Sequence, residues 1–294
     1  MTFSCILFDV DGTLIDTTDL IVEGLTGVLE PQIGRRPPRE EIVALIGRPL
    51  HDQMRIYVDA SLADTLEMQF MEFYEARRAE LERPFPDAIR MIERARDGGR
   101  QVGLVTSKNR REIDGTLELL GFGSLLDFVI CSEDAPRPKP APDPVFEALK
   151  RAGAAAHETL FIGDSIYDMR AGADAGVNTG AALWGPFSRT VLERERPTFY
   201  FESPAAVIAA LELDLHDTAT PRLVRNVVGA GLKPAPTRPE AQPESGVPPR
   251  PDLHDLAAPR SERNVVGAGF KPAPARPEAA GGTAGDASST EEPR

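Results

Sequence analysis

The segment CILFDVDGTLIDTTDLI, residues 5–21, joins a short apolar run to two acidic residues that are separated by one position. The run from Cys5 to Phe8 has the composition of a buried strand, and Asp9 and Asp11 follow where that strand ends. In an open parallel sheet, ligands bind in the crevice beyond the carboxyl ends of the strands. The segment therefore predicts a strand that delivers two carboxylates to a binding crevice.

Apolar runs of the same kind recur through residues 1–213, with helical patterns between them. The helical patterns occupy residues 86–99, 110–122 and 143–153, and each ends near a glycine, as α-helices often do. This alternation predicts an α/β fold with a Rossmann-like parallel sheet that carries helices on both faces. The expected strands are FSCILF (3–8), RQVGLVT (100–106), LDFVIC (126–131), TLFIGD (159–164), NTGAAL (178–183) and TFYF (198–201).

A long insert separates the first two of these strands. Roughly 90 residues there carry no strand signal, and residues 61–85 place apolar side chains at helical spacing. We expect this stripe to form the core of a helical cap over residues 16–85. The α/β core would then consist of residues 1–15 and 86–213. The apolar stripe is made of Leu62, Leu66, Phe70, Phe73 and Tyr74.

Residues 214–294 differ in composition from the rest of the chain. They hold 13 of the 27 prolines and a single aromatic residue, Phe270, so they cannot bury enough apolar surface to offset the entropy of ordering. DLHDTATPR at 214 returns as DLHDLAAPR at 252, which gives two repeats of 38 residues. Two copies are too few for a solenoid. The sequence predicts a disordered, proline-rich C-terminal tail.

Composition excludes several classes of partner and site. Of the net charge of −13, −12 belongs to residues 1–213, and so acidic a surface repels the phosphates of nucleic acid. No apolar run approaches the roughly 20 residues of a membrane-spanning helix, so we expect no membrane partner and a cytoplasmic location. Cys5 and Cys131 lie in apolar runs and are expected to be reduced core thiols.

A third carboxylate is expected in the same crevice as Asp9 and Asp11. Asp164 ends the apolar run TLFIG, so the parallel sheet should bring it to the same edge. Clustered carboxylates favour a hard cation such as Mg²⁺. A calcium-binding loop fails as an alternative, because it requires glycine where Leu14 stands and glutamate where Leu20 stands.

Four motifs occur in the order typical of one enzyme superfamily. They are DVDGT (9–13), VTSK (105–108), RPKPAPDP (137–144) and GDSIYD (163–168). With these motifs, residues 1 to about 213 resemble a haloacid dehalogenase superfamily phosphatase with an inserted helical cap. The segment IGRPL (46–50) is similar to the Gly-Arg-Pro-Leu segment of the branch that contains phosphoglycolate phosphatase and bacterial pyrophosphatases.

The resemblance implies a role for each acidic residue of the crevice. Asp9 is the expected nucleophile, which would form an aspartyl-phosphate. Asp11 would protonate the leaving group and later deprotonate water. The carboxylates of Asp9 and Asp164 and the backbone carbonyl of Asp11 would hold Mg²⁺. Asp168 is assigned to the outer shell of the metal, with the start of a helix as the alternative explanation for an acid at this position.

The resemblance also implies residues that bind the substrate. Thr106 and Lys139 would bind the oxygens of the transferred phosphoryl group, with Ser107 beside them. Arg48 would grip a second anionic group of the substrate. A turn lysine on the surface stays open as the alternative for Lys139, and a surface charge on the cap stays open for Arg48.

Together these residues predict a Mg²⁺-dependent phosphatase that acts on a small phosphorylated metabolite. A guanidinium at position 48 accepts either phosphoglycolate or pyrophosphate. For this reason phosphoglycolate ranks only slightly ahead of pyrophosphate as the expected substrate. A phosphomutase is disfavoured because LIDTTDLIVEGL (14–25) contains no histidine, and a dehalogenase is disfavoured because Asp11 and Gly12 match the phosphatase motif. A non-catalytic binding module is disfavoured because the motif carboxylates and Lys139 are all present.

Overall fold

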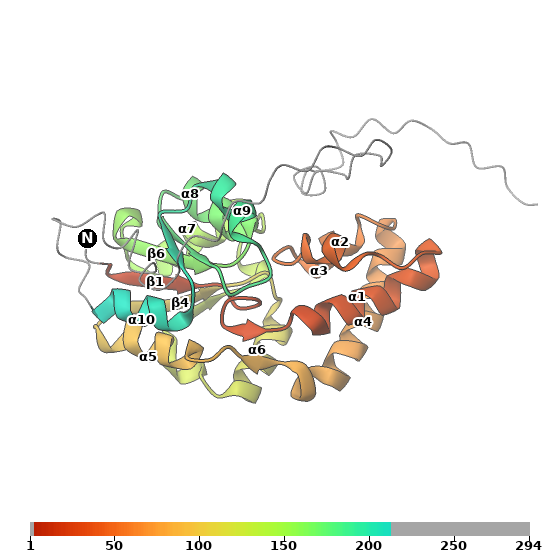
Figure 1. Cartoon of the computed structure of the whole chain (residues 1–294), viewed down its shortest axis with the longest axis horizontal. Helices are drawn as coiled ribbons and strands as arrows, with labels where there is room; N and C mark the ends of the chain where they lie inside the picture. The colour runs from red at the N-terminus through yellow and green to blue at the C-terminus, as the bar shows by residue number, and fades with distance from the viewer. Residues whose placement is uncertain (1–2, 213–294) are drawn as a thin grey trace, which may run out of the picture. The chain divides into compact units, whose positions relative to one another are not determined.

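The computed structural model of the chain describes residues 3–212. The predicted tail and its two repeats therefore lie outside the described residues. A six-stranded sheet has the strand order β5-β4-β1-β6-β7-β8, and every pair of neighbours is parallel. Three of its strands, β4, β1 and β6, lie side by side in Figure 1. The strands are β1 Cys5–Phe8, β4 Gln101–Val105, β5 Phe128–Ile130, β6 Thr159–Gly163, β7 Asn178–Ala182 and β8 Phe199–Phe201. Each one falls within a strand expected from the sequence, which confirms the α/β fold.

Helices cover both faces of the sheet. Alternate strand residues point to opposite faces, so Ile6 and Phe8 pack on one side and Cys5 and Leu7 pack on the other. The first face is covered by α5 Ala88–Asp97, α6 Arg110–Leu120 and α10 Pro204–Glu212. The second face is covered by α7 Asp143–Ala152 and α8 Ile166–Asp174, with the short α9 Arg189–Leu192 against α8. Short 3₁₀ turns lie at Gly123–Leu125, Ser132–Asp134, Ala156–Glu158 and Glu193–Glu195.

The insert between β1 and β4 is helical and has a core of its own. Leu66, Phe70 and Tyr74 of the expected stripe are buried, while Leu62 and Phe73 are half-buried at its edge. The helices are α1 Thr18–Ile33, α2 Arg39–Val43, α3 Leu50–Met54 and α4 Ala60–Leu81. This arrangement supports a separate helical cap, and its boundaries at residues 16 and 85 stay a prediction.

Two short strands that the sequence did not reveal connect the insert to the core. β2 Ile15–Asp16 pairs antiparallel with β3 Arg83–Pro84, so the chain leaves and re-enters the core at one place. A two-residue strand is too short to show the period-2 alternation by which strands are recognised, so neither strand could be predicted from the sequence.

The sheet has its topological switch point at β1. The chain runs from β1 outward to β4 and β5, then returns to β6 on the other side of β1. Phe8 is level with Leu104 of β4 and with Ile162 of β6, so the residues just beyond these three strands meet at one edge. Ligand sites form at such a point.

The structure also bears on two expectations from composition. Cys5 and Cys131 are both buried and unpaired, and burial raises the pKa of each thiol to about 12. These thiols are therefore neutral core residues. Within residues 3–212, no helix combines the length and the apolar character that crossing a membrane requires.

Candidate active site

Three carboxylates meet beyond the ends of β1 and β6. Asp9 follows β1, Asp164 follows β6, and Asp168 lies in the first turn of α8. One oxygen from each lies within 4.8 Å of the others, and all three side chains are buried. Burial raises the pKa of Asp9 to about 7, and the charge of Asp168 adds to this effect, whereas Lys139 opposes it. The cluster is therefore short of positive charge.

Lys139 is the cation within this cluster. Its Nζ donates to Asp9 Oδ1 at 2.8 Å, to Asp168 Oδ1 at 2.6 Å and to the carbonyl oxygen of Val105 at 3.2 Å. Burial lowers the pKa of Lys139, but Asp168 and Asp9 raise it more, so the ammonium stays charged. This geometry argues against a surface turn lysine, because the side chain is almost completely buried.

Local structure holds Asp168 and Asp164 in place. Ser165 is the N-cap of α8, and it forms a capping box with Asp168, whose Oδ2 accepts the Ser165 amide at 3.1 Å. Asp168 therefore begins a helix and also binds Lys139, and its place in the outer shell of a metal stays a prediction. Thr13 donates its hydroxyl to Asp164 Oδ1 at 2.9 Å.

The cluster fits a divalent cation. Asp164 Oδ2 is buried and has no hydrogen-bond partner among the described residues. Burial, followed by the charges of Asp168 and Asp9, raises the pKa of Asp164 well above its usual range. Three carboxylates face one ammonium, so a bound Mg²⁺ would balance their charge and satisfy the free oxygen.

Asp11 lies next to the cluster, on the side of the insert. Its Oδ1 accepts the hydroxyl of Thr17 at 2.7 Å and lies 2.9 Å from Lys108 Nζ. Burial lowers the pKa of Lys108, but the charges around it, first that of Asp11, raise the pKa well above its usual range. Lys108 belongs to the VTSK motif, yet the sequence assigned it no role.

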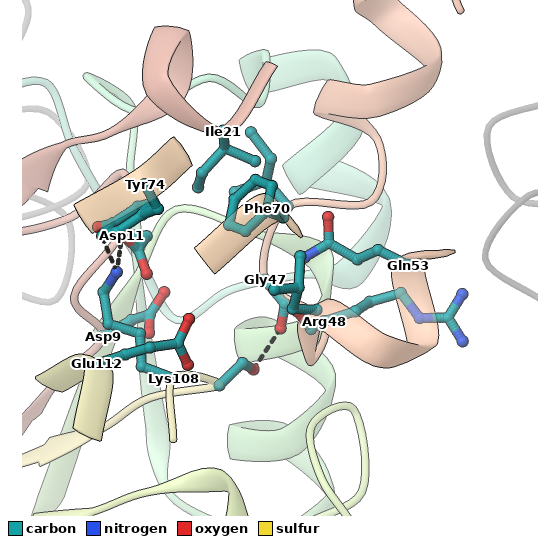
Figure 2. Close-up of a pocket in the computed structure, with 13 residues that line it drawn as sticks. Asp9, Asp11, Ile21, Gly47, Arg48, Gln53, Phe70, Tyr74, Lys108 and Glu112 are labelled. Atoms are coloured by element: carbon teal, nitrogen blue, oxygen red, sulfur yellow. Dashed lines mark hydrogen bonds and ion pairs between the residues drawn. The ribbon is translucent and has the colours of Figure 1, made fainter. Parts of the chain in front are cut away.

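A small chamber lies between Asp9 and Asp11 on one side and the insert on the other (Figure 2). Its volume of about 40 Å³ gives room for roughly three water molecules. Lys108 and Glu112 bring charge to its wall from the core. The insert contributes mainly apolar side chains, which are Ile21, Ile46, Leu50 and Phe70. The chamber is therefore small, with charged groups on the core side and apolar groups on the insert side.

The remaining predicted site residues lie close to this chamber. Thr106 is buried directly after β4, and its hydroxyl oxygen accepts the amide of Lys108 at 3.2 Å. Ser107 donates its hydroxyl to the carbonyl oxygen of Gly47 at 2.6 Å, which joins the core to the insert. Arg48 lines the chamber, but its guanidinium points away from Asp9 and Asp11 and lies 5.8 Å from the ring of Tyr167 (Figure 2).

Comparison with known proteins gives the family. The haloacid dehalogenase-like hydrolase family matches residues 6–182, which include all four motifs. The chain belongs to this family. As a haloacid dehalogenase superfamily phosphatase, it has the parallel sheet that the sequence predicted.

Curated relatives align with this chain along most of their length. Pyrophosphatase PpaX of Bacillus velezensis is 31% identical over 199 residues, which cover 68% of this chain and 92% of the relative. Pyrophosphatase PpaX of Bacillus cereus is 30% identical over 211 residues, which cover 72% of this chain and 97% of the relative.

Solved structures share the fold at lower identity. A protein from Lactobacillus plantarum, assigned as a phosphoglycolate phosphatase, superposes with a TM-score of 0.65 at 24% identity and covers 71% of this chain and 99% of its own. A hydrolase from Pseudomonas syringae superposes with a TM-score of 0.66 at 22% identity and covers 71% of this chain and 98% of its own.

Proposed function

We propose that this phosphatase is Mg²⁺-dependent and hydrolyses a small phosphorylated anion through an aspartyl-phosphate on Asp9. The observation that carries the proposal is the meeting of Asp9, Asp164, Asp168 and Lys139 at the end of β1, with Asp11 beside them. Mg²⁺ held by Asp9, Asp164 and the backbone carbonyl of Asp11 would neutralise the phosphoryl oxygens and reduce their repulsion from Asp9.

The first half of the reaction transfers the phosphoryl group to the enzyme. A carboxylate oxygen of Asp9 forms a bond to phosphorus while the bond from phosphorus to the leaving oxygen breaks. Asp11 gives its proton to that leaving oxygen. Lys139 and Thr106 bind the phosphoryl oxygens, since Lys139 already supplies the positive charge beside Asp9.

The second half releases inorganic phosphate. Water attacks phosphorus, its proton passes to the Asp11 carboxylate, and the bond between phosphorus and Asp9 breaks. Asp11 is then protonated and ready for the next leaving group. Asp9 returns to its carboxylate form beside Lys139.

Two substrates deserve priority, and different observations support them. Pyrophosphate is supported by the two relatives at 30% and 31% identity, which are named pyrophosphatases. Phosphoglycolate is supported by the apolar wall of the chamber, because its leaving group carries a methylene that Ile21 and Phe70 can contact. We rank pyrophosphate first and phosphoglycolate second.

Replacement of the nucleophile tests the reaction. Asp9→Asn should reduce phosphate release by at least about a thousandfold, because the amide cannot attack phosphorus. Asp19→Asn is the matched control, since Asp19 is a solvent-exposed acid of the same segment that pairs with Arg39 on the surface, and it should retain full activity. Near wild-type turnover by Asp9→Asn would overturn the proposal.

A substrate panel separates the two candidates and the alternative classes. The panel is pyrophosphate, phosphoglycolate and a sugar phosphate, with released inorganic phosphate as the readout and with Mg²⁺ present or removed by a chelator. A hydrolase releases phosphate from at least one member only when Mg²⁺ is present. Conversion of a sugar phosphate to an isomer without phosphate release would identify a mutase, and no turnover at all would indicate a binding module.

A further inference from the structure

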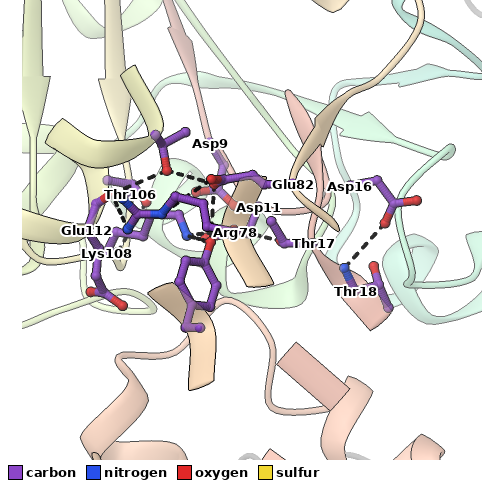
Figure 3. A network of polar contacts seen from close by, with 12 residues as sticks. Asp9, Asp11, Asp16, Thr17, Thr18, Arg78, Glu82, Thr106, Lys108 and Glu112 are labelled. Carbon is purple, nitrogen blue, oxygen red and sulfur yellow. Dashed lines mark hydrogen bonds and ion pairs between the residues drawn. The ribbon is translucent and has the colours of Figure 1, made fainter. Parts of the chain in front are cut away.

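A chain of buried polar contacts joins the acid Asp11 to the insert (Figure 3). Lys108 Nζ lies 2.9 Å from Asp11 Oδ1 and 2.8 Å from the hydroxyl oxygen of Tyr74. That hydroxyl lies 3.1 Å from Glu82 Oε1, which also accepts the hydroxyl of Thr116 at 2.7 Å. Lys108, Tyr74, Glu82 and Thr116 are all buried, so no bulk water competes for these contacts.

The direction of these hydrogen bonds is determined by the groups themselves. A lysine ammonium has only donors, so Lys108 donates to both Asp11 and Tyr74. Tyr74 has one hydroxyl proton, and because its oxygen accepts from Lys108, that proton goes to Glu82. Each of these hydrogen bonds can therefore run in one direction only. Removal of the Tyr74 hydroxyl takes an acceptor from Lys108 and a donor from Glu82.

The contacts also determine how Asp11 is oriented. Lys108 and Thr17 both donate to the same oxygen, Asp11 Oδ1. Two donors on one oxygen hold the carboxyl group against rotation and leave the other oxygen, Oδ2, for the chamber that Asp11 lines. A proton on that second oxygen is the one that can reach a leaving group.

The residues that hold Lys108 come from two parts of the chain. Tyr74 lies on α4, and Glu82 is the C-cap of α4, immediately before β3. Thr116 lies on α6 of the α/β core. Lys108 also lies 4.8 Å from the centre of the Tyr74 ring, so Tyr74 contacts the ammonium with both its ring and its hydroxyl.

We propose that Lys108 is a positioning residue for the acid-base group Asp11, and that Tyr74 and Glu82 hold Lys108 in place. The proposal rests on the proposed function, because it assigns a role within the same reaction. Loss of the Tyr74 hydroxyl should impair only proton donation to the leaving group, since Asp9, Lys139 and the metal ligands are untouched.

The test compares three small substrates. Ethyl phosphate has a poor leaving group, which needs a proton, and no second anion. Acetyl phosphate has a leaving group of similar size that departs without protonation. Phosphoglycolate combines a poor leaving group with a second anion. Wild-type turnover of these substrates, and its loss in Asp9→Asn, establish the proposed function before any variant of the contact chain is assessed.

Tyr74→Phe keeps the ring and removes the hydroxyl. We expect kcat to fall about tenfold for ethyl phosphate and for phosphoglycolate, and less than about twofold for acetyl phosphate, with KM nearly unchanged. Lys108→Met should show the same pattern with losses of about a hundredfold, and Lys108→Arg should recover part of the loss. The ratio of two rates in one preparation does not depend on the fraction of folded enzyme, so reduced stability cannot imitate this pattern.

A matched control and three other outcomes complete the test. Tyr57→Phe removes a tyrosine hydroxyl from the same insert, where no described contact links it to Lys108, and it should leave all three rates unchanged. Equal losses on the three substrates would reduce Tyr74 to a structural role and overturn the proposal. A raised KM confined to phosphoglycolate would show instead that Lys108 binds the second anion. Unchanged rates in Tyr74→Phe and Lys108→Met would also overturn it.

Discussion

At the scale of single residues, Gly12 determines how closely the chain approaches the carboxylate of Asp164. Gly12 has a φ of +79°, and a Cβ added there would lie 2.5 Å from Asp164 Oδ2. This oxygen is the one that lacks a hydrogen-bond partner among the described residues. A methyl group at position 12 would therefore crowd the carboxylate oxygen that we propose as a Mg²⁺ ligand.

Gly12→Ala should abolish Mg²⁺ binding. Gly34→Ala is the matched control, because Gly34 also has a positive φ, +68°, but a Cβ there meets nothing within 4 Å. Both variants should lose roughly 1 kcal/mol of folding stability from backbone strain, and only Gly12→Ala should lose the metal. Calorimetric titration with Mg²⁺ measures the difference. Equal Mg²⁺ affinity in the two variants would show that the metal lies elsewhere.

Arg48 is the residue for which the structure changes the expected result. The sequence-based expectation is a contact with a second anion of the substrate, whose loss would cost about tenfold to a hundredfold in kcat/KM. Because the guanidinium points away from Asp9 and Asp11, we expect Arg48→Ala to lose less than about threefold, equally on phosphoglycolate and ethyl phosphate (Figure 2). A loss of tenfold or more confined to phosphoglycolate would restore the original assignment.

At the scale of elements, the close contact of α1 and α4 builds the insert beside the chamber. Gly24 of α1 lies against Phe70 and Phe73 of α4, and a Cβ at Gly24 would approach Phe70 to 2.7 Å and Phe73 to 2.9 Å. Phe70 in turn lines the chamber. The absence of a side chain at position 24 therefore sets where the chamber wall lies.

Gly24→Ala tests this close contact, with Gly27→Ala in the same helix as its control. An alanine at the exposed position 27 meets nothing within 4 Å and should stabilise the helix by up to about 1 kcal/mol. At position 24 the same gain is opposed by overpacking against two rings, which costs about 1–3 kcal/mol. Urea unfolding should show Gly24→Ala to be the less stable of the two, and equal stabilisation by both would contradict the described packing.

At the scale of the whole molecule, an excess of acidic charge is concentrated in the part of the chain that the structure describes. The buried cluster of Asp9, Asp164 and Asp168 adds internal repulsion to this surface charge. A ligand that binds the folded chain and not the unfolded chain stabilises the fold by mass action. Mg²⁺ should therefore act on stability as well as on catalysis.

Mg²⁺ should raise the melting temperature, and the increase should depend on pH. The folded pKa of Asp9 is raised to about 7, so without metal the folded state binds more protons than the unfolded state between about pH 4 and 7. The stabilisation by the proton on Asp9 is lost as the pH rises toward 7. Above that pH, Mg²⁺ no longer competes with a proton for the Asp9 carboxylate. The Mg²⁺-induced increase should be large at pH 8 and small at pH 5.5.

Asp164→Asn provides the control for this measurement. The amide removes one of the repelling charges, so the metal-free variant should melt at a higher temperature than the metal-free wild type. The Mg²⁺-induced increase should disappear. A full Mg²⁺ response in Asp164→Asn would exclude the carboxylate cluster as the site of stabilisation.

The sheet, its crevice and the residues that end its strands could be predicted from local sequence patterns. Apolar runs between helical patterns are local signals, and the carboxyl ends of parallel strands must share one edge of the sheet. For these reasons Asp9, Asp11 and Asp164 could be placed together from the sequence, and the four motifs placed Lys139 beside them. The family match and the strand order confirm the predicted fold, and the roles of these residues stay a prediction.

The contacts between the insert and the core depend on three-dimensional packing, and no sequence pattern predicted them. Tyr74 and Glu82 belong to none of the four motifs. The contact of Tyr74 with Lys108 and that of Glu82 with Thr116 each join residues that are 34 positions apart in the sequence. The burial of Lys108 and the direction of the Arg48 side chain depend on the side chains that surround these residues in the folded protein. Helical spacing could predict that Tyr74 is buried, but periodicity is a property of one helix and carries no information about which polar group its hydroxyl will meet.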